Sequence, residues 1–133
     1  MLKSAGVYLA VFVAMLVVDM VWLRLVAVQW YAEGMGPLLT NSPNLWAAAA
    51  FYLMFPAGLL IFAVFPSADA PLVKAVTMGA LFGFFAYATY DLTALAVIKG
   101  WPVGLTFLDM AWGTIVSGVS AGAGKLALDH LNQ

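Results

Sequence analysis

Residues 5–28 read AGVYLAVFVAMLVVDMVWLRLVAV and contain two charged side chains, Asp19 and Arg24. A helix needs about 20 predominantly apolar residues to cross a bilayer. The stretch meets this length, exceeds the roughly 7–15 apolar residues of a signal peptide, and has no clear small-x-small cleavage site. We therefore predict a retained first membrane-spanning helix that carries an aspartate inside it.

Three further stretches have the same character, and we place them at residues 44–65, 73–98 and 103–126. The chain of 133 residues is 65% hydrophobic and 8% charged, with a mean hydropathy of +1.03. Soluble domains contain only about 45–50% apolar residues. The predicted fold class is therefore all-α, an integral membrane four-helix bundle formed by a single transmembrane domain over residues 1–133.

Turn residues indicate where the helices begin and end. Ser42-Pro43 has the pattern of an N-cap followed by a first-turn proline, which predicts the start of the second helix. Gly100 and Pro102 have the pattern of a C-terminal glycine and a helix-starting proline. We therefore expect the third and fourth helices to form a tight antiparallel hairpin.

The longest connection, residues 29–43, is expected to be a partly apolar loop along the membrane interface. Trp30, Tyr31 and Trp46 are the residue types that collect at the level of the lipid headgroups. We therefore expect these three side chains to anchor the chain there.

Basic residues are distributed unevenly between the two sides of this arrangement. Lys3, Lys74 and Lys125 fall on one side, and Lys99 and Arg24 fall on the other. Because cytoplasmic loops carry an excess of Lys and Arg, we expect both termini on the cytoplasmic side.

Composition excludes several classes of function. The net charge of −1 provides no basic field for nucleic acid. The absence of cysteine excludes thiolate catalysis and Cys-ligated metal clusters. The one histidine, His130, lies near the C-terminus, so a haem held by two histidines of one chain is excluded inside the membrane.

Asp19, Asp91 and Asp109 lie inside predicted spans, where a carboxylate costs roughly 2.5–3.5 kcal/mol on insertion scales. At 1.5 Å per residue, each lies roughly 10–14 Å from the same face of the membrane. We interpret this shared depth as a polar pocket. Ionised carboxylates this close repel one another, so we expect a retained proton or a bound cation. The alternative is a dry cluster that fixes helix register by hydrogen bonds.

Aromatic and hydroxyl side chains share helical faces with these aspartates. The three faces are Tyr8-Phe12-Met15-Asp19-Trp22, Phe84-Tyr87-Ala88-Asp91 and Thr106-Asp109-Trp112-Gly113-Val116-Ser120. The candidate ligand-binding residues are Asp19, Asp91, Asp109, Trp22, Tyr87, Tyr90, Trp112, Thr106 and Arg24. The sequence singles out no catalytic residue, no dedicated metal ligand and no cofactor.

Arg24 is the candidate counter-charge of this pocket. It follows Asp19 by five residues, about 140° around the helix, so pairing within the helix is poor. Its alternatives are Glu33, an aspartate of another helix, and the lipid headgroups.

Small residues recur at four-residue spacing in the third and fourth predicted helices. Gly79-x-x-x-Gly83 and Gly118-x-x-x-Gly122 provide faces for close helix packing. We favour packing within the hairpin over a homodimer contact.

Several strings together resemble one family of membrane proteins. They are Asp19-x-x-Trp22-Leu23, Gly36-Pro37-Leu38-Leu39, Tyr87-Ala88-Thr89-Tyr90-Asp91-Leu92-Thr93, Gly100-Trp101-Pro102 and Asp109-Met110-Ala111-Trp112-Gly113-Thr114. The family consists of small bacterial four-helix inner-membrane proteins and is catalogued as a domain of unknown function. The resemblance covers nearly the whole chain and implies a multi-pass protein of the bacterial inner membrane. It implies no activity or cofactor.

Three classes of function are compatible with these patterns. The first, which we favour, is a membrane-embedded protein whose acidic pocket holds a proton, a cation or a small basic ligand, including a transport role. The second is a structural or accessory subunit whose aspartates hold helices together. The third is a lipid-modifying enzyme with paired carboxylates or a divalent metal held by Asp19, Asp91 and Asp109, although the sequence lacks a nucleophile with a base.

Overall fold

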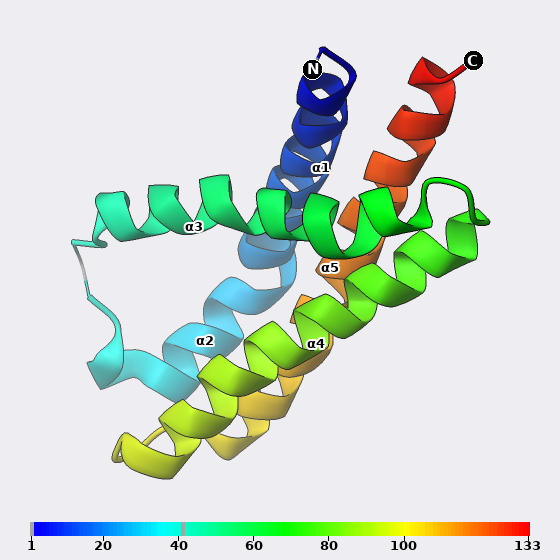
Figure 1. Cartoon of the computed structure of the whole chain (residues 1–133). Coiled ribbons are helices and arrows are strands. Elements are labelled where there is room, and N and C mark those ends of the chain that lie inside the picture. Colours follow the sequence, from blue (N-terminus) through cyan, green and yellow to red (C-terminus); the bar gives the residue numbers. More distant parts are fainter. Residues whose placement is uncertain (1, 41) are drawn as a thin grey trace.

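The computed structural model describes residues 2–40 and 42–133, which form helices and turns with no strand among them (Figure 1). The elements are α1 (Leu2–Val21), the π-helical η1 (Trp22–Ala27), α2 (Val28–Met35), η2 (Gly36–Leu38), α3 (Leu45–Leu59), the π-helical η3 (Leu60–Val64), η4 (Phe65–Ser67), α4 (Leu72–Val97) and α5 (Val103–Leu131). The segments long and apolar enough to cross a membrane are Leu2–Leu25, Leu45–Ser67, Leu72–Val97 and Val103–Leu131. The predicted four-span, all-α membrane bundle is confirmed.

The hairpin of α4 and α5 is the most closely packed part of the bundle. Its turn contains Gly100 with a φ of +80°, a conformation that a side chain would strain. A Cβ on Gly83 would overlap the Ser117 side chain and the Gly113 carbonyl oxygen, and a Cβ on Gly79 would overlap the Ala121 Cβ. Both glycine pairs therefore pack within the hairpin, although not against each other, because Gly118 and Gly122 of α5 contact Val76 of α4.

Both termini lie at the same end of the bundle, which we call the terminal end (Figure 1). Polar contacts connect segments of the chain there. The Lys3 Nζ donates to Asn132 Oδ1 at 3.0 Å and so joins the two ends of the chain. The Lys125 Nζ pairs with Asp129 at 2.6 Å and donates to the Ala68 carbonyl oxygen at 3.1 Å. The link between α3 and α4 therefore lies at this end, and the Gly100 turn lies at the other, the turn end.

The predicted N-cap of the second membrane helix was wrong by two residues. Asn44, not Ser42, is the N-cap, because its side chain accepts a hydrogen bond from the Ala47 N–H at 3.1 Å. The helix begins at Leu45. Serine and asparagine are both good N-cap residues, so the residue type alone did not decide between Ser42 and Asn44. Pro43 lies before the N-cap and does not occupy the first helical turn.

The expected loop over residues 29–43 was wrong in its first half, because α2 continues as a helix to Met35. The tertiary contacts of α2 explain this. Tyr31 donates to Asp109 of α5, and a Cβ on Gly34 would overlap the Leu105 side chain. Trp30 is 51% exposed, but Tyr31 turns inward and is not the interface anchor that we expected.

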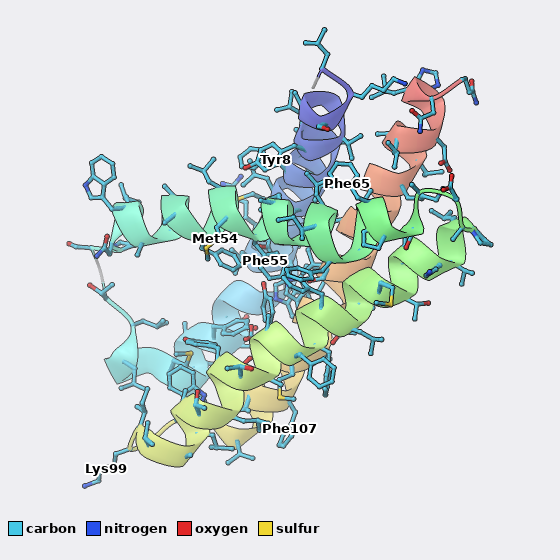
Figure 2. The ribbon with its side chains drawn as sticks, in the orientation of Figure 1. Tyr8, Met54, Phe55, Phe65, Lys99 and Phe107 are labelled. Atoms are coloured by element: carbon cyan, nitrogen blue, oxygen red, sulfur yellow. The ribbon has the colours of Figure 1, made fainter. Side chains whose placement is uncertain are left out.

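The core forms where α1, α3 and α5 meet. Its buried members include Val11, Leu59 and Val116. The Tyr8 hydroxyl donates to the Leu53 carbonyl oxygen at 2.6 Å and joins α1 to α3; Figure 2 labels Tyr8 beside α3. The beginning of α3 leaves this core, and Trp46 near its start is 88% exposed.

Two of the predicted helical faces need correction. On α1 the buried stripe is Val7, Val11, Met15 and Asp19. It therefore runs beside Tyr8 and Phe12, which are only half-buried. On α4, Phe84 is exposed, whereas Ala88 and Asp91 are buried. The buried positions of α4 also include Gly79 and Gly83, which let α5 approach closely.

Candidate functional site

The three membrane aspartates lie at one level of the bundle. Asp19 is six residues from the end of its span at Leu25, Asp91 is six residues from Val97, and Asp109 is six residues from Val103. By residue count, each aspartate is therefore about 9 Å along its helix from that end of its candidate span. Within residues 2–40 and 42–133 they do not come together as one group of three; Asp109 lines one space with Asp91 and another with Asp19.

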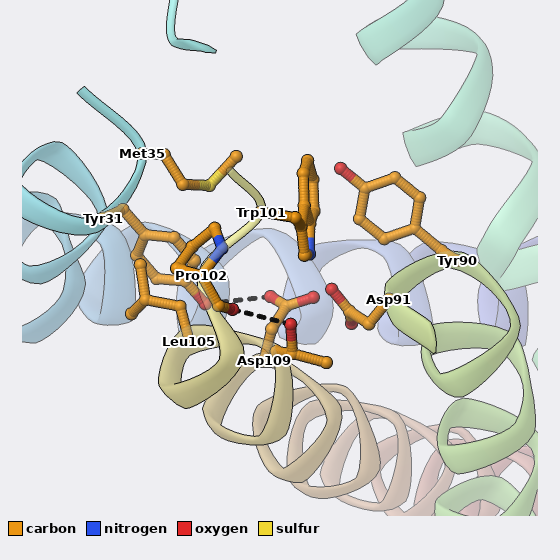
Figure 3. A pocket seen from close by; sticks show the side chains of 9 residues that line it. Tyr31, Met35, Tyr90, Asp91, Trp101, Pro102, Leu105 and Asp109 are labelled. Carbon is orange, nitrogen blue, oxygen red and sulfur yellow. Dashed lines mark hydrogen bonds between the residues drawn. The ribbon is translucent and has the colours of Figure 1, made fainter. Parts of the chain in front are cut away.

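Asp91 and Asp109 lie next to each other on the wall of a space of about 170 Å³, which we call the acidic cavity (Figure 3). It is lined by Tyr31, Met35, Tyr90, Asp91, Trp101, Pro102, Leu105, Thr106 and Asp109. Asp91 is 2% exposed, and its buried Oδ2 has no hydrogen-bond partner in the described part of the chain. None of the lining residues is basic. Two carboxyl groups therefore share this cavity without a counter-charge.

Tyr31 of α2 forms a hydrogen bond with Asp109. Its hydroxyl donates to Asp109 Oδ1 at 2.8 Å, which fixes α2 against α5 (Figure 3). The pKa of Tyr31 is raised well above its ordinary value, first by burial and then by the Asp109 carboxylate. The phenol therefore keeps its proton and remains a donor. The Thr106 hydroxyl donates to the Pro102 carbonyl oxygen at 2.7 Å, so its own proton is not directed to a ligand.

We expect Tyr31→Phe to lower the free energy of unfolding by about 1.5–3 kcal/mol, because it removes a hydrogen bond to a charged acceptor. Loss of this donor also frees α2, so proteolysis between α2 and α3 should accelerate. Unfolding in mixed detergent–SDS micelles and limited proteolysis measure the two effects. Tyr8→Phe, which removes a hydroxyl at the terminal end, is the control that should leave the α2–α3 segment protected. Equal proteolysis of both variants would contradict the role of Tyr31.

Asp19 has a different environment. Its Oδ2 accepts from the Tyr52 hydroxyl and its Oδ1 from the Trp112 Nε1, both at 2.8 Å. The Trp112 ring stacks on Trp22, with centroids 4.3 Å apart and planes at 7°. Asp19 therefore joins α1 to α3 and α5 through two satisfied oxygens. The adjoining space of about 160 Å³ also reaches Asp109.

A larger hollow, which we call the aromatic groove, lies between α3 and α4. It measures about 490 Å³ and is lined by Phe51, Met54, Phe55, Ala86, Tyr87, Tyr90 and Asp109. Asp109 is its one charged residue, and Tyr90 and Asp109 also line the acidic cavity. Tyr90 packs edge-on against Trp101, with ring centroids 5.7 Å apart. The groove therefore adjoins the acidic cavity at these two residues.

Arg24 is not among the residues lining either acidic space. It lies on an exposed surface beside Leu16 and Met20. Within the described ranges no ion pair joins it to a carboxylate, and Glu33 accepts instead from Gln29 Nε2 at 3.2 Å. Nor do any three His, Asp or Glu side chains of residues 2–40 and 42–133 come together as a metal-binding group.

Of the sequence-predicted residues, the acidic cavity brings together Asp91, Asp109, Tyr90 and Thr106, whereas Asp19, Trp22, Tyr87 and Trp112 line the Asp19 side. The sequence reasoning missed Tyr31 and Trp101 as site residues. Trp101 lies in the turn between Gly100 and Pro102, and the sequence pattern there indicated only a turn and not a contact with a cavity. Tyr31 carried no signal, because only the path of α2 brings it to Asp109.

Comparison with known proteins gives a family without an assigned activity. The model of the family described as "Predicted membrane protein (DUF2177)" matches residues 4–126. Neither the curated proteins nor the solved structures yield a match to the chain.

Proposed function

This chain belongs to the DUF2177 family of predicted membrane proteins, and we propose that it binds one positive charge, carried by a protonated amine, between Asp91 and Asp109 inside the membrane. We place it in the bacterial cytoplasmic membrane as a multi-pass protein. The distribution of lysines supports cytoplasmic termini, since Lys3 and Lys125 both lie at the terminal end.

The observation that carries this proposal is the unpartnered Oδ2 of Asp91. A buried polar atom without a hydrogen bond is costly, and a second carboxyl group beside it in the same cavity adds repulsion. A cation relieves both at once. An ammonium group also provides several N–H donors, enough to reach oxygens of both carboxyl groups.

The aromatic lining supports the same ligand. Tyr90 and Trp101 present rings to the acidic cavity, and aromatic faces attract cations, more strongly where water is excluded. The volume of about 170 Å³ holds an ammonium group with a few waters, since one water takes about 30 Å³. We assign Asp19 a structural role, because its two hydrogen bonds join three helices.

Binding of methylammonium tests the proposal directly. With the protein in lipid nanodiscs and empty discs as background, equilibrium dialysis of radiolabelled methylammonium should show saturable binding. We expect Asp91→Asn and Asp109→Asn each to weaken it at least about tenfold, a loss of about 1.4 kcal/mol. Asp69→Asn, in the exposed α3–α4 link, is the matched control and should bind as the unmodified protein does. Undetectable binding by the unmodified protein, or equal binding by all three variants, would overturn the proposal.

A further inference from the structure

We infer that the ligand is a lipophilic amine, whose ammonium group lies between Asp91 and Asp109 and whose apolar body lies in the aromatic groove. The inference rests on the proposed function, and adds the substrate class and the route of entry. Its basis is that a charged cavity and an apolar groove meet at the same two residues, Tyr90 and Asp109.

The groove has the dimensions and lining of a ligand site. Its volume of about 490 Å³ lies within the roughly 300–1,000 Å³ typical of small-molecule pockets. Phe51, Phe55 and Tyr87 form adjoining aromatic walls, with ring centroids 5.2 Å apart for the first pair and 6.1 Å for Phe55 and Tyr87. An apolar wall with one carboxylate at its end matches a molecule that is apolar along its length and positive at one end.

The open edge of the groove lies on the outer surface of the bundle. Met54 on α3 is 69% exposed and Tyr90 on α4 is 57% exposed, and both line the groove. Figure 2 shows Met54 and Phe55 together on α3. In a spanning helix such exposed apolar surface contacts lipid tails. A ligand dissolved in the bilayer can therefore enter sideways between α3 and α4.

Charge distinguishes a simple amine from an aminophospholipid. A zwitterionic headgroup would bring a phosphate next to the carboxylates. No basic side chain lines the acidic cavity or the groove to balance that phosphate. Like charges inside a low-dielectric site cost several kcal/mol. The complementary ligand is therefore a monocation with an apolar chain and no attached anion.

The test compares dodecylammonium with methylammonium in variants that fill the groove. Ala86 is half-buried on the α4 wall and does not line the acidic cavity, so Ala86→Phe occupies groove volume from a residue outside the proposed ammonium site. Met54→Trp does the same from the exposed α3 side, where folding is least disturbed. Ala96→Phe is the matched control, because Ala96 is exposed on α4 and lines neither space. Equilibrium dialysis into nanodiscs, corrected with empty discs, measures each amine.

We expect both groove variants to bind dodecylammonium at least about tenfold more weakly than the unmodified protein, with methylammonium binding and the Ala96→Phe control unchanged. Competition by phosphatidylethanolamine added to the discs should be weak. Unchanged dodecylammonium binding in both groove variants, or strong competition by phosphatidylethanolamine, would overturn the lipophilic-amine inference while leaving methylammonium binding intact. Absence of methylammonium binding to the unmodified protein would instead contradict the proposed function itself.

Discussion

Replacing two aspartates at the same depth with leucine should change stability in opposite directions. Asp91→Leu is expected to raise the free energy of unfolding by about 1–3 kcal/mol, a gain of the size seen when a strained functional group is removed. Asp19→Leu is expected to lower it by about 2–5 kcal/mol, from two lost hydrogen bonds. The contrast separates a ligand-binding carboxyl group from one that holds helices together.

The gain at Asp91 follows from its surroundings. Its Oδ2 is buried without a partner, Asp109 lies beside it, and about 170 Å³ of adjoining space accommodates the larger leucine side chain. A carboxyl group kept in this state without its ligand is destabilising. Removing it therefore stabilises the empty protein and abolishes its binding.

The loss at Asp19 follows from two donors. Leucine would leave the Tyr52 hydroxyl and the Trp112 Nε1 without their acceptor in an apolar environment. Each unsatisfied buried donor costs about 1–3 kcal/mol. The stacked pair of Trp112 and Trp22 would also lose the contact that orients it.

Reversible unfolding in mixed detergent–SDS micelles measures both variants. Asp69→Leu in the exposed link serves as the control and should stay within about 0.5 kcal/mol of the unmodified protein. Destabilisation by Asp91→Leu similar to that by Asp19→Leu would show that both carboxyl groups are structural, and would count against the proposed binding site.

A single methyl group in the hairpin should have the second large effect. Gly83→Ala is expected to cost about 1–3 kcal/mol, as overpacking in a dense interior does. The new Cβ would overlap the Ser117 side chain and the Gly113 carbonyl oxygen. A backbone carbonyl cannot rotate away, so α4 and α5 must separate. Because Asp91 and Asp109 lie on these two helices, the substitution should also weaken amine binding.

The control for this variant is Gly104→Ala near the start of α5, where nothing lies within 4 Å of the added Cβ. Alanine is a better helix former than glycine by about 1 kcal/mol, so this variant should be neutral or slightly stabilised. SDS unfolding and methylammonium dialysis measure both variants. A Gly83→Ala protein as stable as Gly104→Ala would show that the hairpin is looser than the structure indicates.

Much of the fold could be predicted because its signals are local. Hydrophobic length identifies a spanning helix without reference to any neighbour. The shared depth of Asp19, Asp91 and Asp109 also followed from counting residues along helices. By contrast, the N-cap at Asn44 and the helix through Tyr31 depended on competition between nearby signals or on contacts with α5.

Residue order and apolar composition alone therefore settled that this chain is a four-span helical bundle with three carboxyl groups at one level, since both properties depend only on rise per residue and transfer free energy. Which aspartate serves which purpose was decided by tertiary structure. The rotation and approach of α2, α3 and α5 supply Asp19 with two donors, supply Asp109 with one, and leave Asp91 Oδ2 with none. Hydrogen bonds between segments far apart in the chain produce no periodic pattern in the sequence. Here these hydrogen bonds distinguish a structural carboxyl group from the pair proposed to bind a cation.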